Sequence, residues 1–311
     1  MFMDVGTTVE AIKSMEIRGA GRIARAGASA LADFATTYEG NDPKDFMIGL
    51  MDAKESILDS RPTAVSLWNG VHATLKGVED CTSVGDAKAL IIKNAENFNK
   101  GSLDAVRIIG EIGAKRIQDG DVILTHCNSS AALSVIKTAF RQGKKFRVYA
   151  TESRPWRQGI LTVNELAKEG IDITLIIDSA VRSVMKSVTK VFVGADTITS
   201  HGTLINKIGT SQLAAAANEA RVQFYVCSET YKFSPMTLFG DLVTIEERDH
   251  DEVAKRDILE PSVKIFNPVF DSTPSKYIDG IITEVGLISP GSVYHVMTHQ
   301  LGDDIFKFIG D

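Results

Sequence analysis

A cysteine and an aspartate follow two of the short apolar runs in the second half of the chain, and both residue types can move protons. Cys127 comes just after the run 122–125, and Asp196 ends the run 191–196. A tight turn and a helix-like segment follow Cys127, and the start of a helix lowers the pKa of a nearby thiol. We therefore expect a reactive thiolate at Cys127. The plainer interpretations are a buried structural cysteine and, for Asp196, a cap on the loop behind it.

Two segments have the composition of an anion site. The stretch 197–209 is polar and punctuated by glycine, carries Asn206 and Lys207, and leads into an alanine-rich helix. Backbone amides and one lysine in such a stretch could hold a phosphate. Arg18 lies in a second segment of this kind, between residues 18 and 21, where glycine lets the backbone approach a phosphate closely. Either segment taken alone is more often ordinary surface.

The composition narrows the class of protein. The chain has 311 residues and a net charge of −6, which argues against a general nucleic-acid or anionic-membrane surface. Its three cysteines lack CxxC spacing, so neither a disulfide framework nor a tetrahedral zinc site is expected. The first residues resemble no signal peptide, and no apolar run approaches the ~20 residues that span a bilayer. We expect a cytoplasmic protein with no metal and no membrane partner.

The pattern of the chain changes near residue 118. Before it, apolar residues recur at helical spacing, with expected helices at 9–17, 24–36, 44–58, 64–75, 83–99 and 104–118. After it, apolar runs at 122–125, 146–150, 173–177, 191–194, 222–227 and 280–283 alternate with helical segments at 130–141, 158–169, 179–187 and 209–220. This alternation predicts parallel βαβ units. The fold class is therefore α/β, with a helical N-terminal domain (1–118) followed by a Rossmann-like, doubly wound parallel sheet (119–311). Within the latter, 230–279 is expected to be a long excursion with one short helix at 251–257.

Ligands of such sheets bind beyond the carboxyl ends of the strands, at the point where the strand order reverses. No GxGxxG follows the first strand, so we do not expect NAD, or any other cofactor. His126 should point away from the thiol, because neighbouring side chains of a strand alternate. The residues at the expected strand ends are a thiol, four carboxylates and a nearby cation: Cys127, Glu152, Asp178, Asp196, Glu229 and Lys232.

These residues also occur in segments that resemble a known family across essentially the whole chain. The sequence closely resembles the ribose-1,5-bisphosphate isomerases, a branch of the superfamily that includes the methylthioribose-1-phosphate isomerases and the initiation factor 2B regulatory subunits. It has glycine at position 21, where the methylthioribose branch would have proline, and Ser153 where threonine is expected. The segments that carry the resemblance are 18–21, 61–63, 125–128, 152–155, 193–196 and 206–209.

The resemblance implies an aldose–ketose isomerase that converts α-D-ribose 1,5-bisphosphate into D-ribulose 1,5-bisphosphate in nucleotide (AMP) salvage. Cys127 matches the family's general base and Asp196 its general acid. It also implies a homo-oligomer that is dimer-based and could extend to a hexamer, a sugar bisphosphate as the small-molecule partner, and no nucleic acid. The implied substrate-binding residues are Arg18, Gly19, Ala20, Gly21, Arg61, Ser129, Ser130, Ala131, Asn206, Lys207 and Lys232.

Two alternatives stay open at this point. A methylthioribose-1-phosphate isomerase would use the same Cys127 and Asp196, but its substrate has one phosphate and an apolar tail. A non-catalytic subunit of the initiation factor 2B type would bind a nucleotide and a protein partner without turnover. Two cationic segments favour the bisphosphate over the first alternative.

Overall fold

The computed structural model describes residues 4–240 and 242–301. Contacts between Cα atoms divide the chain into two compact units, Met1–Ala105 and Val106–Asp311. We refer to them as unit 1 and unit 2 and describe each by itself. The division falls inside a long helix, α5 (Val84–Ala114), whose last residues belong to unit 2.

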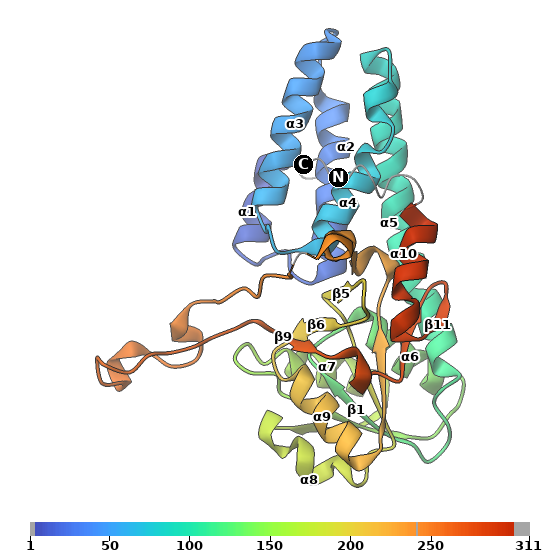
Figure 1. Cartoon of the computed structure of the whole chain (residues 1–311), viewed down its shortest axis with the longest axis vertical. Helices are drawn as coiled ribbons and strands as arrows, with labels where there is room; N and C mark the ends of the chain where they lie inside the picture. The colour runs from blue at the N-terminus through green and yellow to red at the C-terminus, as the bar shows by residue number, and fades with distance from the viewer. Residues whose placement is uncertain (1–3, 241, 302–311) are drawn as a thin grey trace. The chain divides into compact units, whose positions relative to one another are not determined.

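Unit 1 is helical, as its periodicity predicts (Figure 1). Asp42 begins α3 by accepting hydrogen bonds from the backbone N–H groups of Lys44 and Asp45, with Pro43 at the first helical position. The two helices expected at 83–99 and 104–118 form the single helix α5, because packing of its buried face overrides the Gly101-Ser102 break. The other helices of the unit are α1 (Val5–Lys13), α2 (Ala20–Thr37), α3 (Pro43–Asp59), α4 (Val65–Leu75) and the 3₁₀ turn Val78–Asp80.

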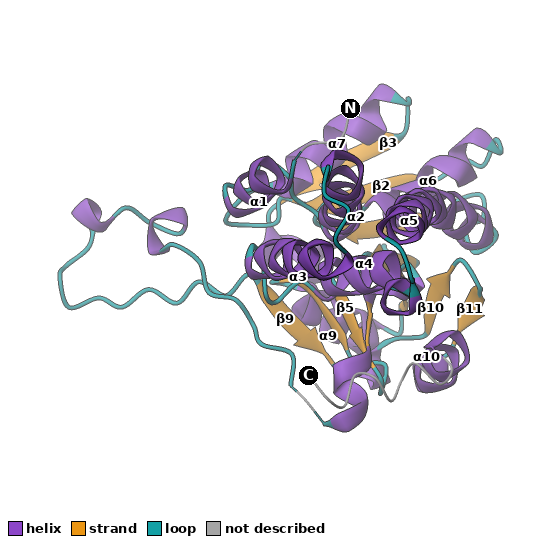
Figure 2. Ribbon diagram, turned by 90° about the horizontal axis from the view of Figure 1, so that it is seen from above, coloured by secondary structure: helices purple, strands orange, loops and turns teal. Residues whose placement is uncertain are grey.

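Unit 2 contains a seven-stranded sheet in the order β11-β10-β7-β4-β1-β2-β3. All neighbouring strands are parallel except β10 and β11, and the edge strands β3 and β11 lie at opposite ends of the sheet in Figure 2. The chain runs from β1 to β3 on one side and then crosses to β4 on the other, so the strand order reverses between β1 and β4. The strands are β1 (Val122–His126), β2 (Arg147–Thr151), β3 (Asp172–Ile176), β4 (Lys190–Val193), β7 (Gln223–Cys227), β10 (Gly280–Thr283) and β11 (Gly286–Ile288).

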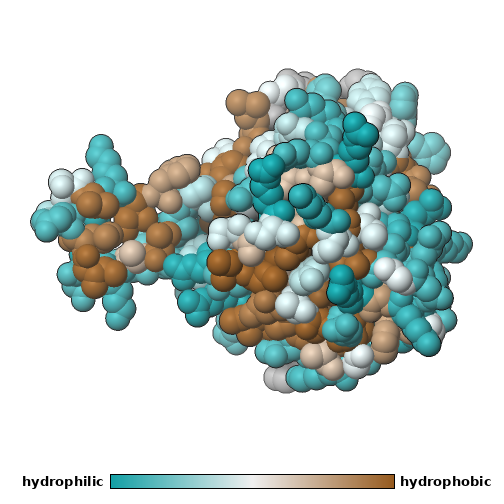
Figure 3. Space-filling model, turned by 90° about the horizontal axis from the view of Figure 1, so that it is seen from below, coloured by the Kyte–Doolittle hydropathy of each residue, from teal (hydrophilic) through white to brown (hydrophobic). Residues whose placement is uncertain are grey.

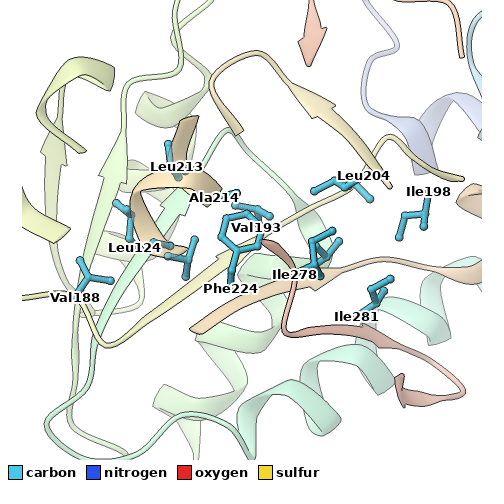
Figure 4. Packing of buried hydrophobic residues seen from close by; sticks show 14 of the residues in the cluster. Leu124, Val188, Val193, Ile198, Leu204, Leu213, Ala214, Phe224, Ile278 and Ile281 are labelled. Atoms are coloured by element: carbon cyan, nitrogen blue, oxygen red, sulfur yellow. The ribbon is translucent and has the colours of Figure 1, made fainter. Parts of the chain in front are cut away.

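The central strands β1, β4, β7 and β10 are buried on both faces, which explains why they are continuous apolar runs, whereas the edge strands β3 and β11 are exposed or half-buried. Adjacent residues of one strand enter different clusters: Leu124 and Phe224 pack in one, Ile123 and Tyr225 in the other. In Figure 4 the first cluster gathers against Leu213 of α9. All six predicted strands and the four helices predicted between them are confirmed: α6 (Ser130–Arg141), α7 (Gln158–Lys168), α8 (Val181–Met185) and α9 (Thr210–Ala220). A further helix, α10 (Val293–Leu301), was not predicted.

A second, four-stranded sheet in the order β8-β5-β6-β9 was not expected from the sequence. The stretch 197–209, predicted to be a loop, contains the antiparallel pair β5 (Thr197–Thr199) and β6 (Leu204–Lys207). The long excursion supplies β8 (Phe233–Ser234) and β9 (Phe270–Thr273). These strands have two to four residues, too few for a period-two pattern to stand out.

Residues 242–268 form a segment that we call the arm. The prediction of one helix at 251–257 is wrong, since two 3₁₀ turns, His250–Glu252 and Arg256–Ile258, occupy this region. A bridge between Glu247 and Pro268 joins the ends of the arm. No arm residue belongs to any hydrophobic cluster of the described residues. The remaining 3₁₀ turns of unit 2 are Asp178–Ala180, Thr230–Lys232, Pro235–Phe239, Ser275–Tyr277 and Pro290–Ser292.

Within residues 4–240 and 242–301, no helix has the length and apolar character needed to cross a membrane.

Candidate active site

The strand-order reversal of unit 2 places Cys127 and Asp196 on neighbouring strands. The last residues of β1 and β4, His126 and Val193, are directly paired. Cys127 follows the first strand by one residue, and Asp196 follows the second by three. This is the position at which open parallel sheets bind ligands.

Gly194 allows the residues after β4 to approach the start of α6 closely. A Cβ atom at this position would lie 2.3 Å from Ser129 Oγ and 2.4 Å from Ser129 Cβ. Ser129 is the N-cap of α6, and its hydroxyl accepts a hydrogen bond from the Ala132 N–H over 3.3 Å. Ser130 and Ala131 form the first turn of the same helix. The predicted substrate residues Ser129, Ser130 and Ala131 therefore lie on the helix start that adjoins the end of β4.

The thiol of Cys127 is surrounded by charged groups but is not activated in the free protein. Burial raises the pKa of Cys127 to about 11, the nearby carboxylates of Asp196 and Asp178 act in the same direction, and the Lys207 ammonium opposes them. The prediction of a lowered thiol pKa is therefore wrong in direction. The cause is desolvation, the largest contribution, which outweighs the opposing effect of the Lys207 ammonium. The same electrostatic couplings place Cys127, Asp196 and Lys207 close together.

This shift predicts how the thiol reacts with an alkylating agent. With a pKa of about 11, the thiolate fraction of Cys127 rises about tenfold for each pH unit between 7 and 10. The rate constant for iodoacetamide modification, followed on the Cys127 peptide by mass spectrometry, should rise in the same proportion. A rate that levels off near pH 7 would show that the thiol is already ionised and would contradict this assignment.

Asn206 and Lys207 end β6, and both side chains are buried. The Asn206 amide donates to the Thr210 hydroxyl over 3.0 Å, and Lys207 Nζ lies 5.3 Å from the centre of the Phe270 ring. The amide cradle expected around them is already occupied. The N–H groups of Gly209 and Ser211 donate to the Asp271 carboxylate, whose pKa is raised by burial. An anion here would have to be held by the side chains of Asn206 and Lys207.

Lys232 forms a buried ion pair with Glu229. Its ammonium lies 2.7 Å from Glu229 Oε2, and the two side chains are 8% and 3% exposed. The strand after Lys232, β8, pairs with β5 so that Phe233 faces Ile198. Lys232 therefore lies beside the segment that follows Asp196. A phosphate bound by Lys232 would share the ammonium with a buried carboxylate.

The remaining predicted substrate residues belong to unit 1. Gly19 has a φ of 89° and is the N-cap of α2, while Ala20 and Gly21 form its first turn. The Ala20 carbonyl accepts a hydrogen bond from the Ser66 hydroxyl over 2.9 Å. Arg61 lies just before α4, with its Nη1 3.4 Å from the sulfur of Met15. The two segments that contain Arg18 and Arg61 thus meet at one end of unit 1.

His126 does not act on the thiol, as strand alternation predicts. Its Nδ1 lies 2.5 Å from the Thr151 hydroxyl, and its Nε2 lies 2.9 Å from the Ile208 carbonyl. Burial lowers the pKa of His126, so the ring is neutral near pH 7.

The carboxylates of Asp178 and Asp271 also organise this site, although neither was predicted to hold backbone amides there. Asp178 follows β3, so its position at a strand end can be predicted. Asp271 caps the start of α9 but lies sixty residues further along the chain, so no local pattern connects the two. Within the described part of the chain, no three His, Cys, Asp or Glu side chains are grouped in a way that could hold a metal ion.

Comparisons with known proteins agree with this architecture. Residues 16–290 match the model of the Initiation factor 2 subunit family. Proteins named ribose 1,5-bisphosphate isomerase are 54% identical in Archaeoglobus fulgidus, covering 96% of this chain and 94% of that protein, and 50% identical in Methanocaldococcus jannaschii, covering 95% and 94%. A methylthioribose-1-phosphate isomerase of Thermosipho melanesiensis is 37% identical, covering 90% of this chain and 85% of that protein.

Solved structures support the same assignment of the fold. The translation initiation factor eIF-2B of Pyrococcus horikoshii superposes with a TM-score of 0.78 at 35% identity, covering 92% of this chain and 97% of that one. Because the family model covers most of the chain and near-full-length relatives exceed half identity, the chain belongs to the Initiation factor 2 subunit family.

Proposed function

We propose that this chain is a ribose 1,5-bisphosphate isomerase that converts α-D-ribose 1,5-bisphosphate into D-ribulose 1,5-bisphosphate. The observation that carries the proposal is the 54% identity to a protein of that name across 96% of the chain. The site supports it, because Cys127 and Asp196 follow the two strands at the strand-order reversal and the Lys207 ammonium acts on the Cys127 thiol.

The chemistry requires a base and an acid. Phosphate on the anomeric oxygen prevents spontaneous ring opening, so the ring must be opened by catalysis. Cys127 removes the proton on C2, and that electron pair forms the C1–C2 double bond. The C1–ring oxygen bond breaks, and Asp196 protonates the departing oxygen. The enol loses its hydroxyl proton and C1 gains a proton, which gives the ketone.

The raised pKa of Cys127 determines how this base operates. Ionising a thiol of pKa about 11 at pH 7 costs about 5 kcal/mol, at 1.36 kcal/mol per pKa unit. The thiolate is therefore rare in the free protein, but it is strongly basic when it forms. Lys207 is the group that offsets part of this cost, since its ammonium stabilises the thiolate.

In unit 2, Asn206, Lys207 and Lys232 are proposed to bind a phosphate, and the amides of residues 129–131 are proposed to contact the sugar. In unit 1, Arg18, Arg61 and the start of α2 are proposed as a second phosphate-binding group. Each of the two phosphate-binding groups contains two cationic side chains, as a substrate with two phosphates requires.

Replacing Lys207 with methionine tests the phosphate role. A hydrogen bond to a charged group contributes about 1.5–3 kcal/mol, so KM should rise about 10- to 100-fold. Alkylation of Cys127 should also become slower, because the ammonium that stabilises the thiolate is lost. Steady-state kinetics measure the first effect and peptide mass spectrometry the second. Lys186→Met, at an exposed lysine that ends α8, is the matched control and should change neither.

We further propose a homo-oligomer built from dimers. The arm supports this, because its Leu242, Ile258 and Phe266 side chains are 92%, 74% and 73% exposed. Figure 3 shows apolar surface on this segment. Exposed apolar side chains on a segment that belongs to no hydrophobic cluster of the described residues are typical of a contact with another subunit.

Replacing Ile258 and Phe266 with serine should therefore lower the mass measured by light scattering. The control is Ile48→Ser, which changes an exposed apolar side chain of unit 1. An unchanged mass in the arm variant would exclude the arm from the interface.

Substrate preference tests the function itself. The purified chain should have a kcat/KM at least about 10²-fold higher for ribose 1,5-bisphosphate than for methylthioribose 1-phosphate, because the latter leaves one cationic group unpaired. Comparable values, or a preference for methylthioribose 1-phosphate, would favour the other isomerase. No turnover of either would favour a non-catalytic subunit.

A further inference from the structure

Cys127 lies in the left-handed region of backbone conformation, with a φ of 66°. This region costs a residue with a Cβ roughly 1–2 kcal/mol, so surrounding groups must hold it there. The Cys127 N–H donates to Ser153 Oγ over 2.7 Å, and the Cys127 carbonyl accepts from Thr162 Oγ1 over 2.7 Å. Both polar groups of the Cys127 backbone are therefore bonded to side-chain hydroxyls.

Ser153 is held in the same way. It is fully buried and left-handed, with a φ of 60°. Its N–H donates to Asp178 Oδ1 over 2.9 Å, and the Arg154 N–H donates to Asp178 Oδ2 over 2.8 Å. Because β3, β2 and β1 are neighbours, Asp178 fixes the end of the middle strand, and Ser153 then fixes the end of β1.

The His126 ring links this arrangement to the segment of Lys207. The Ile208 carbonyl can only accept, so His126 Nε2 carries the hydrogen and the neutral Nδ1 accepts from the Thr151 hydroxyl. Ser153 Oγ lies 3.3 Å from the same Nδ1. The residue after Lys207 is thereby tied to the strand that ends at the thiol.

We propose that Ser153, Thr162 and Asp178 are positioning residues that keep Cys127 in its left-handed conformation and so direct its thiol toward the substrate. This inference rests on the proposed role of Cys127 as the base. Without a hydroxyl partner, Cys127 can relax toward an ordinary backbone conformation and displace the thiol. A misplacement of about 1 Å costs an enzyme about 10²-fold in rate.

Ser153→Ala and Thr162→Val remove one hydroxyl each. Valine has nearly the shape of threonine, so the second change leaves the packing of α7 in place. Thr162→Ser restores the hydroxyl and should restore the rate. Thr189→Val is the matched control, because Thr189 bonds the opposite end of β1: its hydroxyl accepts from the Val122 N–H over 3.1 Å and donates to Asp121 over 2.7 Å.

Steady-state kinetics on ribose 1,5-bisphosphate, corrected for the folded fraction by thermal unfolding, give the answer. We expect kcat to fall about 10- to 100-fold in Ser153→Ala and Thr162→Val, with KM within about threefold. Thr162→Ser and Thr189→Val should stay within about threefold of the parent in both constants. The inference is overturned if kcat of the folded enzyme is unchanged in both hydroxyl-removing variants, or if their loss appears in KM.

Cys127→Ser separates this inference from the proposed function. If Cys127→Ser loses activity while Ser153→Ala and Thr162→Val keep it, the base assignment stands and positioning by the hydroxyls is refuted. If Cys127→Ser keeps the parent kcat, the base assignment fails and the positioning role fails with it.

Discussion

Replacing Cys127 with serine is expected to lower kcat by about 10²–10⁴-fold, the usual contribution of a general base, with KM little changed. Serine has the size of cysteine, so the fold should remain, but its hydroxyl is a far weaker acid and supplies almost no alkoxide near neutral pH. The loss should therefore appear in the chemical step. Steady-state kinetics with ribose 1,5-bisphosphate measure it.

Cys81→Ser is the control for this substitution. Cys81 is a half-buried free cysteine of unit 1, whose thiol contacts the Gly77 carbonyl at 3.7 Å. Its loss should leave kcat unchanged. A Cys127→Ser enzyme with kcat within threefold of the parent would show that another group removes the proton.

Asp196→Asn should also lower kcat by about 10²–10⁴-fold, because the amide cannot protonate the departing ring oxygen. The same substitution should increase the rate at which Cys127 is alkylated. The Asp196 carboxylate raises the pKa of Cys127, so its removal favours the thiolate and should make iodoacetamide modification of Cys127 faster.

Turnover and alkylation measured on Asp196→Asn together distinguish loss of the acid from a displacement of the site. Slower turnover with faster alkylation is the expected pair of results. Slower turnover with slower alkylation would instead indicate that the end of β4 has moved, and it would argue against Asp196 as the acid.

The large sheet could be predicted because burial on both faces makes its central strands unbroken apolar runs, whereas the partly exposed three-residue edge strand β11 was missed. Cys127 and Asp196 could likewise be placed at the same sheet edge, since parallel strands end together and ligands bind where their order reverses. The second sheet could not be predicted, because β5 and β6 have three and four residues and pair with strands far along the chain.

The pKa of Cys127 and the hydrogen-bond partners of the amides after Lys207 could not be predicted from local sequence patterns. The helix predicted after Cys127 is present, but the pKa of the thiol is decided by desolvation, which depends on the packing around it. The amides near Asn206 and Lys207 suggested a phosphate cradle, yet Asp271 from β9 occupies those of Gly209 and Ser211. Both errors come from groups that only the tertiary fold brings close.

Turnover of α-D-ribose 1,5-bisphosphate in D₂O, followed by ¹H NMR, tests the central claim most directly. If Cys127 removes the C2 proton and C1 is reprotonated from a group that exchanges with solvent, D-ribulose 1,5-bisphosphate should form with deuterium at C1. Failure to form this product would contradict the isomerase assignment. Product that carries two protium atoms and no deuterium at C1 would contradict reprotonation of C1 by a group that exchanges with solvent.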